Sequence, residues 1–280
     1  MISEADLQEL AESKNLLTIG VRADEVRRRL HGTRTTFVRV FEIHVEAPVS
    51  ALPPRTSAGE FRIVGSPKSL RGAADAVRNA RVIAAKTPLT GFSLAELTEL
   101  EGASSLHETC RVLREAGLDG IADVPLDALH DAATTITTAR GAGLMVTRLI
   151  VNAARDHDRG ELAHRARQLQ ESIGGFRAWA PLPRAVPIAS PTTGYDDVKQ
   201  IALARLIADN IESIQVDWQL YGPKLAQFAL TVGADDVDGV AAVDPGTLGT
   251  RRSPVEEIRG NIRSAGLEAV ERNGRFEAVG

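Results

Sequence analysis

Short apolar runs alternate with amphipathic stretches along nearly the whole chain of 280 residues. The first run, TTFVRVFEIHV, is rich in β-branched and aromatic residues, which favour strands. Apolar residues three and four positions apart favour helices instead. The pattern predicts strands at 35–45, 61–65, 81–86, 118–124, 144–151, 176–182 and 211–219, with a weaker eighth run at 237–243. It predicts helices at 3–14, 22–31, 66–80, 93–100, 104–117, 128–143, 160–175, 196–210 and 223–234, and a final helix with a short strand-like end in 253–272.

Seven or eight apolar strands that alternate with helices indicate parallel βαβ units. At this strand number the leading architecture is an α/β fold of the (β/α)8 TIM-like barrel type, complete or lacking a strand. A doubly wound open sheet is the alternative, but no glycine-rich dinucleotide loop follows the first strand. We expect one domain over 1–280. It would comprise an N-terminal helical extension at 1–34, a barrel at 35–245 and a C-terminal extension at 246–280.

Composition narrows the class of protein. Hydrophobic residues make up 43% and charged residues 25%, which is typical of a soluble globular protein. The net charge of −4 argues against a nucleic-acid binder, and no apolar run is long enough to span a membrane. The N-terminus lacks the basic start and apolar core of a signal peptide, so we expect a cytoplasmic protein. The single cysteine, Cys110, excludes an internal disulfide.

Candidate site residues lie where the predicted strands end, because chemistry in such barrels sits at the carboxyl ends of the strands. Candidates for acid–base chemistry are His44, Glu46, Lys86 and Asp217. Candidates for ligand binding are Gln215, Lys224, Gln227, Asp235, Asp236 and Asp238. Plainer interpretations remain open, namely a hydrogen-bonded strand histidine, a structural Glu46–Lys86 ion pair and a solvated turn for the three aspartates. The scattered histidines form no HxH or HxxxH pair, so no metal site is predicted.

The second half of the chain carries a resemblance. RARQLQESIGGFRAWAPL at 165–182 and the stretch 192–240, with TTG, DDVKQIALARL, PKLAQ and GADDVDG, resemble the aminofutalosine synthase family. These are radical S-adenosylmethionine enzymes of the futalosine route to menaquinone. Their relatives include dehypoxanthine futalosine cyclase and the synthases of the deazaflavin chromophore. The likeness extends to ADEVRRRLHG and SSLHETCRVLREAGLDG, and so to most of the chain.

The resemblance implies a CxxxCxxC motif in the loop after the first strand, where three thiolates hold a four-iron four-sulfur cluster. Laid on this sequence, the three cysteines fall on or near Val49, Pro53 and Thr56, none of which ligates iron. The family's glycine-rich stretch with a Glu after strand four reads IADVPLD, and its polar segment after strand five reads VNAA. We therefore expect no iron–sulfur cluster, while S-adenosylmethionine stays a candidate ligand.

Three functions remain open at this point. The first is a cluster-free relative that acts as a pseudoenzyme, with a small-molecule ligand or a futalosine-pathway protein as its partner, as a monomer or a homo-oligomer. The second is an enzyme with non-radical acid–base chemistry on a related small molecule. The third is a binding protein for an aromatic acid, a nucleoside or S-adenosylmethionine. In each case the loop at 46–60 is expected to fill the former cluster cavity at least in part, because Ala51, Leu52, Pro53 and Pro54 are small or stiff and apolar.

Overall fold

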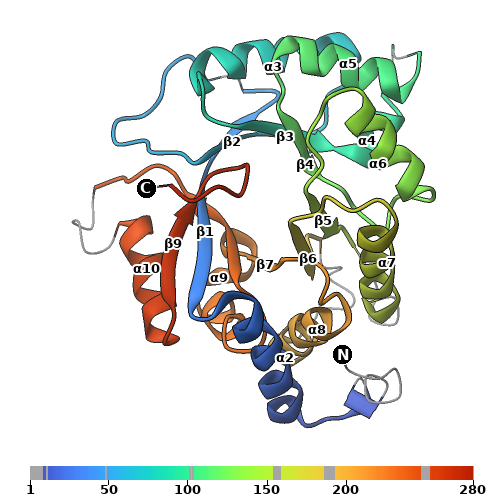
Figure 1. The fold of residues 1–280 in the computed structure, drawn as a ribbon. Helices are drawn as coiled ribbons and strands as arrows, with labels where there is room; N and C mark the ends of the chain where they lie inside the picture. The colour runs from blue at the N-terminus through green and yellow to red at the C-terminus, as the bar shows by residue number, and fades with distance from the viewer. Residues whose placement is uncertain are drawn as a thin grey trace. The chain divides into compact units, whose positions relative to one another are not determined.

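The computed structural model describes residues 9–10, 12–47, 49–100, 102, 104–153, 159–185, 193–246 and 253–279 (Figure 1). The helix expected at 3–14 and the loop at 183–194 fall largely outside these residues. The chain divides into two compact units. Unit 1 contains residues 1–37, 149–238 and 258–270, and unit 2 contains 38–148, 239–257 and 271–280. The expected division into a barrel at 35–245 with two terminal extensions stays a prediction.

Eight parallel strands alternate with helices, which confirms the (β/α)8 TIM-like fold class. The strands are β1 Arg34–His44, β2 Glu60–Val64, β3 Leu89–Ser93, β4 Gly120–Asp123, β5 Arg148–Val151, β6 Ala178–Pro183, β7 Ser213–Asp217 and β8 Asp236–Ala241, followed by β9 Glu268–Arg272. The helices are α2 Leu16–His31, α3 Leu70–Ala84, α4 Leu94–Thr98, α5 Leu106–Ala116, α6 Ala132–Gly141, α7 Arg159–Ser172, α8 Gly194–Ile207, α9 Trp218–Ala229 and α10 Pro254–Ser264.

In unit 2 the strand order is β4-β3-β2-β1, and the register pairs Phe61 with both Phe41 and Leu89. Helices α3 and α5 pack beside each other next to these strands (Figure 1). The buried face of α3 consists of alanines and Val77, so that helix can approach the sheet closely. Alternate strand residues therefore point away from α3, and these include Glu42, His44, Glu60, Arg62 and Thr90.

In unit 1 the order is β8-β7-β6-β5, and helices α2 and α8 pack against each other (Figure 1). Thr193 and Asp196 form a capping box at the start of α8. The register pairs Gln215 with Asp236 and Asp217 with Asp238. Strands β1 and β8 each begin in unit 1 and end in unit 2.

Several predicted boundaries are confirmed, including the helix stops at Gly32 and Gly117 and a helix beginning at Pro223 after the non-helical Gly222. The strand predicted at 81–86 is wrong, because these residues complete α3 and the loop after it. Ala80 and Ala84 continue the buried helical face, whereas Val82 is 83% exposed. The apolar run RVIAA therefore belongs to a helix, and the third strand begins only at Leu89.

One prediction concerns Asp119, just before β4. Burial alone would raise the pKa of Asp119, but hydrogen bonds from the Leu89 backbone and from Arg81 outweigh it and hold this pKa below its usual value. A carboxylate whose pKa is lower in the folded than in the unfolded state stabilises the fold at pH values above the unfolded-state pKa, about 3.9. This stabilisation is lost as the pH falls through the folded-state pKa. Replacing Asp119 with Asn is expected to cost about 1–2 kcal/mol at pH 7 and less at pH 3, measured by urea denaturation.

The exposed Asp75, paired with the exposed Arg78, provides the control for this prediction. Asp75→Asn is expected to leave the urea midpoint unchanged at both pH values. A loss for Asp119→Asn that is equally large at pH 7 and pH 3 would show that the carboxylate charge is not what stabilises this corner.

Candidate functional site

One polar surface lies in unit 2, on the side of the strands that faces away from α3. We call it the Glu42 face, and it consists of Glu42, His44, Glu60, Arg62 and Thr90. Glu42 and His44 alternate at the end of β1, and both side chains are exposed. In the register, Glu42 is opposite Arg62 and His44 is opposite Val64. The predicted position of His44 at the end of the first strand is confirmed, and Glu42 is a neighbour that sequence reasoning missed.

Below the exposed pair, Glu60, Arg62 and Thr90 form a buried network. Glu60 Oε1 accepts a hydrogen bond from Arg62 Nε at 2.9 Å and one from the Thr90 hydroxyl at 2.5 Å. Glu60 and Arg62 are each only 5% exposed. Burying two charges costs desolvation free energy. The hydrogen bonds to Glu60 offset part of that cost and fix Arg62 and Thr90 in one arrangement beneath the exposed pair. Its sequence signal is the alternation of charges within EFRIV.

A second polar surface lies in unit 1. We call it the Gln215 face, and it consists of Gln215 and Asp217 on β7 together with Asp236 and Asp238 on β8. Asp236 accepts a hydrogen bond from the Thr36 hydroxyl at 2.5 Å and one from Gln215 Nε2 at 2.7 Å. Gln215, Asp236 and Asp238 are at most 1% exposed. The prediction that Gln215 and Asp217 point the same way agrees with this register, and Asp236 and Asp238 are buried rather than part of a solvated turn.

Asp217 has a structural role that its position alone did not reveal. It is the N-cap of α9, where Oδ1 accepts hydrogen bonds from the backbone N–H groups of Gln219 and Leu220 at 2.9 and 3.0 Å. Its other oxygen lies 3.6 Å from Nη1 of Arg184, which follows β6. Because both oxygens are engaged, Asp217 is poorly suited to the role of a general base.

Asp235 lies apart from the Gln215 face, just before β8. Its carboxylate is bound to the fully buried Arg205 and accepts a hydrogen bond from the Ile214 N–H at 2.9 Å. Burial raises the pKa of Asp235, and the Arg205 guanidinium acts against that rise. Lys224 and Gln227 lie on α9, where Lys224 is exposed and Gln227 half-buried. Their predicted ligand roles stay predictions.

Lys86 is not where the sequence placed it. It was expected at the carboxyl end of a strand, but it is an exposed residue between α3 and β3. Glu46 follows the carboxyl end of β1. Because β1, β2 and β3 are parallel, Lys86 and Glu46 lie at opposite ends of this sheet. A shared acid–base role or an ion pair between them is therefore excluded.

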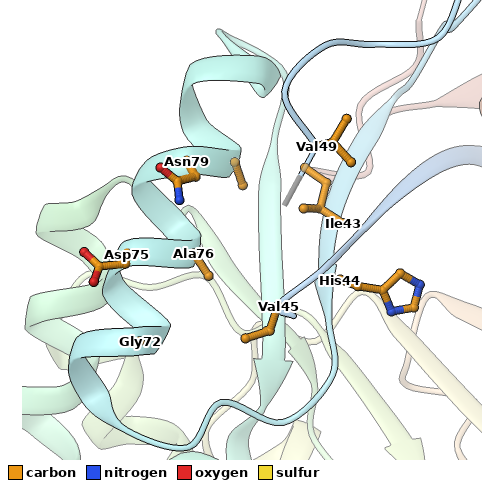
Figure 2. Close-up of a pocket in the computed structure, with 9 residues that line it drawn as sticks. Ile43, His44, Val45, Val49, Gly72, Asp75, Ala76 and Asn79 are labelled. Carbon is orange, nitrogen blue, oxygen red and sulfur yellow. The ribbon is translucent and has the colours of Figure 1, made fainter. Parts of the chain in front are cut away.

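The loop after β1 shows what occupies the expected cluster positions. Thr56 donates a hydrogen bond to the Pro53 carbonyl at 2.6 Å and pairs with Val243 after β8. Val49 borders a hollow of about 120 Å³ between the end of β1 and α3. Figure 2 shows Ile43, Val45 and Ala76 beside this hollow, with the His44 ring pointing away from it. Residues 51–54 are all exposed. That the loop at 46–60 partly fills a former cluster cavity stays a prediction.

The residues of this chain do not fit a cluster held by three cysteines. Val49, Pro53 and Thr56 offer no thiolate, and Cys110 is fully buried on α5. Within the described ranges, no three His, Cys, Asp or Glu side chains are placed to share a metal ion. Across the same residues, no helix has both the length and the hydropathy needed to cross a membrane.

A second prediction concerns the reactivity of Cys110. Burial raises the pKa of its thiol to about 11, so only about 0.1% would be thiolate at pH 8. We expect no reaction with iodoacetamide in the folded protein and complete reaction in urea, measured by intact mass. Stoichiometric labelling of the folded protein would show that α5 opens readily. An introduced cysteine at exposed Val82, Val82→Cys, is the positive control.

Solved structures share the (β/α)8 fold of this chain. The chain is similar to methylornithine synthase, with a TM-score of 0.63 and 14% identity over 96% of this chain and 94% of that one. It is also similar to the FeFe-hydrogenase maturase HydG from Carboxydothermus hydrogenoformans, with a TM-score of 0.65 and 10% identity over 99% of this chain and 77% of that one. At these identities the likeness establishes the shared (β/α)8 architecture and leaves function open.

The sequence comparisons relate parts of the chain to known proteins. Residues 180–279 match the family described as the CofH/MqnC C-terminal region. The aminodeoxyfutalosine synthase of Streptomyces coelicolor is 34% identical over 41% of this chain and 35% of that protein. The 5-amino-6-(D-ribitylamino)uracil–L-tyrosine 4-hydroxyphenyl transferase of Methanococcoides burtonii is 28% identical over 67% of this chain and 63% of that protein. The chain thus spans less than two thirds of each of these relatives.

The resemblance seen in the sequence is therefore confirmed. The chain is a divergent relative of aminofutalosine synthase and of the CofH/MqnC proteins.

Proposed function

We propose that this chain is a cluster-free relative of aminofutalosine synthase that binds a small molecule and carries out no radical chemistry. The observation that carries the proposal is the loop after β1, where Val49, Pro53 and Thr56 replace the expected thiolates. Reductive cleavage of S-adenosylmethionine needs an electron from a bound cluster, and one buried cysteine cannot hold it. By relationship, the role lies in or beside menaquinone biosynthesis, as a pseudoenzyme or as the partner subunit of a futalosine-pathway enzyme.

The polar strand faces support retention of a binding role. The Glu42 face presents an exposed His and Glu above a buried ion pair, and the Gln215 face holds three carboxylates and an amide. Buried polar groups cost stability relative to apolar ones. A protein that served only as a scaffold would be more stable with apolar residues at these positions. The polar residues found there therefore favour a role in ligand binding.

The non-radical enzyme is the second candidate, and the geometry weakens its original form. Lys86 lies at the wrong end of its strand, and Asp217 caps a helix. What remains for acid–base chemistry is the exposed pair Glu42 and His44, two residues apart on β1. That pair motivates a search for turnover once a ligand is known.

The test is a calorimetric titration of the purified protein with S-adenosylmethionine, combined with iron analysis after anaerobic reconstitution with iron and sulfide. We expect saturable binding with iron well below one equivalent per chain. Methionine and adenosine, titrated separately, show which part of the ligand is recognised. Cluster incorporation with release of 5′-deoxyadenosine would refute the proposal. Absence of binding would refute a retained S-adenosylmethionine site and leave the partner-subunit form, tested by co-purification with aminofutalosine synthase.

A further inference from the structure

Three guanidinium groups surround Asp119 at the amino end of β4, in unit 2. Arg81 from α3, Arg114 from α5 and Arg275 from the turn after β9 each place a nitrogen 2.5–3.5 Å from its carboxylate. Because the strands are parallel, this corner is at the opposite end of the sheet from His44 at the carboxyl end of β1. One carboxylate cannot balance three guanidinium groups, so the corner has an excess of positive charge.

Arg81 uses its N–H donors within the fold. Its Nη2 donates to Asp119 Oδ2 at 2.5 Å and to the Gly117 carbonyl at 2.8 Å. Its Nε also donates to the Gly117 carbonyl, at 2.9 Å, and its Nη1 donates to the carbonyls of Ala85 and Thr87 at 2.9 and 3.0 Å. These carbonyl groups lie just beyond the carboxyl ends of α5 and α3, where a cation is favourable. Arg81 therefore has a structural role and leaves no donor for a ligand.

Arg114 and Arg275 differ from Arg81 in keeping most of their donors available. Arg114 Nη1 donates to the Leu118 carbonyl at 3.1 Å and lies 3.5 Å from Asp119 Oδ1, and Arg275 Nη2 lies 3.5 Å from the same oxygen. Strong charge-assisted hydrogen bonds are shorter, about 2.7–2.9 Å, so Asp119 holds both groups weakly. The two side chains are 47% and 46% exposed. A single small ligand arriving from solvent can therefore contact both guanidinium groups.

The acidic residues next to this pair of arginines are engaged elsewhere. Glu115 pairs with Arg111, and Glu277 accepts a hydrogen bond from Asn273 Nδ2 at 2.8 Å. Across the part of the chain that the structure describes, the pair has no ion pair other than those with Asp119. The exposed Lys86 adds a further positive charge in the loop between α3 and β3. The excess positive charge of the corner therefore stands after each neighbouring carboxylate is assigned its partner.

We propose that Arg114 and Arg275 bind the phosphate group of a small molecule at the amino end of β4. The two guanidinium groups come from separate elements, α5 and the turn after β9, so their ligand needs acceptor oxygens that point in more than one direction. A phosphate group offers three terminal oxygens and up to two negative charges, whereas a carboxylate offers two coplanar oxygens and one charge. This site lies apart from the polar strand faces described above and goes beyond the proposed function.

The experiment compares inorganic phosphate, acetate and chloride at matched ionic strength, in nitrogen-15 NMR titrations of the whole chain at pH 8. We expect phosphate alone to give saturable shifts of the backbone amides at 114–120 and 273–276, with about millimolar affinity. Arg114→Gln and Arg275→Gln should each weaken phosphate binding at least fivefold, and the double variant should abolish it. Both side chains are half-exposed and weakly paired, so the urea midpoint should stay unchanged in each variant.

Arg111→Gln is the matched control, because Arg111 lies on the same helix as Arg114 and is equally exposed, but pairs with Glu108 and Glu115. Its affinity for phosphate should equal that of the parent protein. An equal loss in Arg111→Gln, or shifts that chloride reproduces, would mean that only general positive charge attracts the anion and would overturn the inference. Acetate that binds as tightly as phosphate would overturn the assignment to a phosphate group, and so would the absence of saturation by phosphate.

Discussion

Replacing Arg205 with Met is expected to cost about 3–5 kcal/mol of the free energy of unfolding. The side chain is fully buried and donates to the carbonyl of Gly233 at 3.0 Å and to those of Ile211 and Glu212 at 3.2 Å. It also pairs with Asp235, which is 2% exposed. Its loss would leave three carbonyl groups without this donor and a buried carboxylate without its strongest counter-charge. Thermal and urea denaturation measure the loss.

The deficit of Arg205→Met should shrink as the pH falls toward 4. Without the guanidinium, the raised pKa of Asp235 rises further. A buried carboxyl group with a raised pKa destabilises the fold at pH values at which the unfolded chain would ionise it, and this penalty disappears as the pH falls and the group is protonated in both states. Arg28→Met is the control, because Arg28 is largely exposed and pairs with Asp24 at the surface. Little change in the urea midpoint is expected there. Similar losses for both variants would contradict the argument from burial.

The second large effect is expected at Glu60 in unit 2. Glu60→Ala removes the acceptor shared by Arg62 and Thr90 and leaves a buried guanidinium with one partner fewer. Arg62 keeps a further interaction, so the expected loss is about 2–3 kcal/mol, smaller than at Arg205. Glu60→Gln keeps an oxygen acceptor and the side-chain volume and should recover about half of that loss.

Glu96 provides the comparison for Glu60. It accepts a hydrogen bond from the Ser66 hydroxyl at 2.6 Å at the surface of the same unit. Glu96→Ala is expected to stay within about 0.5 kcal/mol of the parent protein in urea denaturation. If Glu60→Ala were equally mild, the buried network of Glu60, Arg62 and Thr90 would contribute little to stability and would not hold the Glu42 face in one geometry.

The fold class could be predicted because parallel strands buried on both sides read as continuous apolar runs. Runs with clear ends, such as FRIVG before Ser66, gave strand positions close to those observed. The run RVIAAK misled because six residues cannot distinguish a strand from the last turns of a buried helix. Only the positions of Ala73, Val77 and Ala80 on one face of α3 resolve that ambiguity.

The site was less predictable for a different reason. Sequence places a polar residue at the end of a strand, but it does not say which groups already engage it. Asp217 and Asp235 looked alike as acidic residues near strand ends, yet one caps a helix and the other is bound by Arg205. Conversely, Glu60 and Arg62 were overlooked inside an apolar run because their value comes from facing each other and Thr90.

The passage of β1 and β8 through both units has a consequence for synthesis of the protein on the ribosome. Thr36 at the start of β1 bonds Asp236 at the start of β8, two residues separated by 200 positions. At about 5–20 residues per second, the first strand waits roughly 10–40 s for this partner to emerge. During that interval the backbone edge of β1 that lies beside β8 in the folded chain is unpaired, and Phe37 and Phe41, which are buried in the folded protein, lack part of their final cover. The nascent chain is therefore expected to need chaperone protection until β8 has left the exit tunnel.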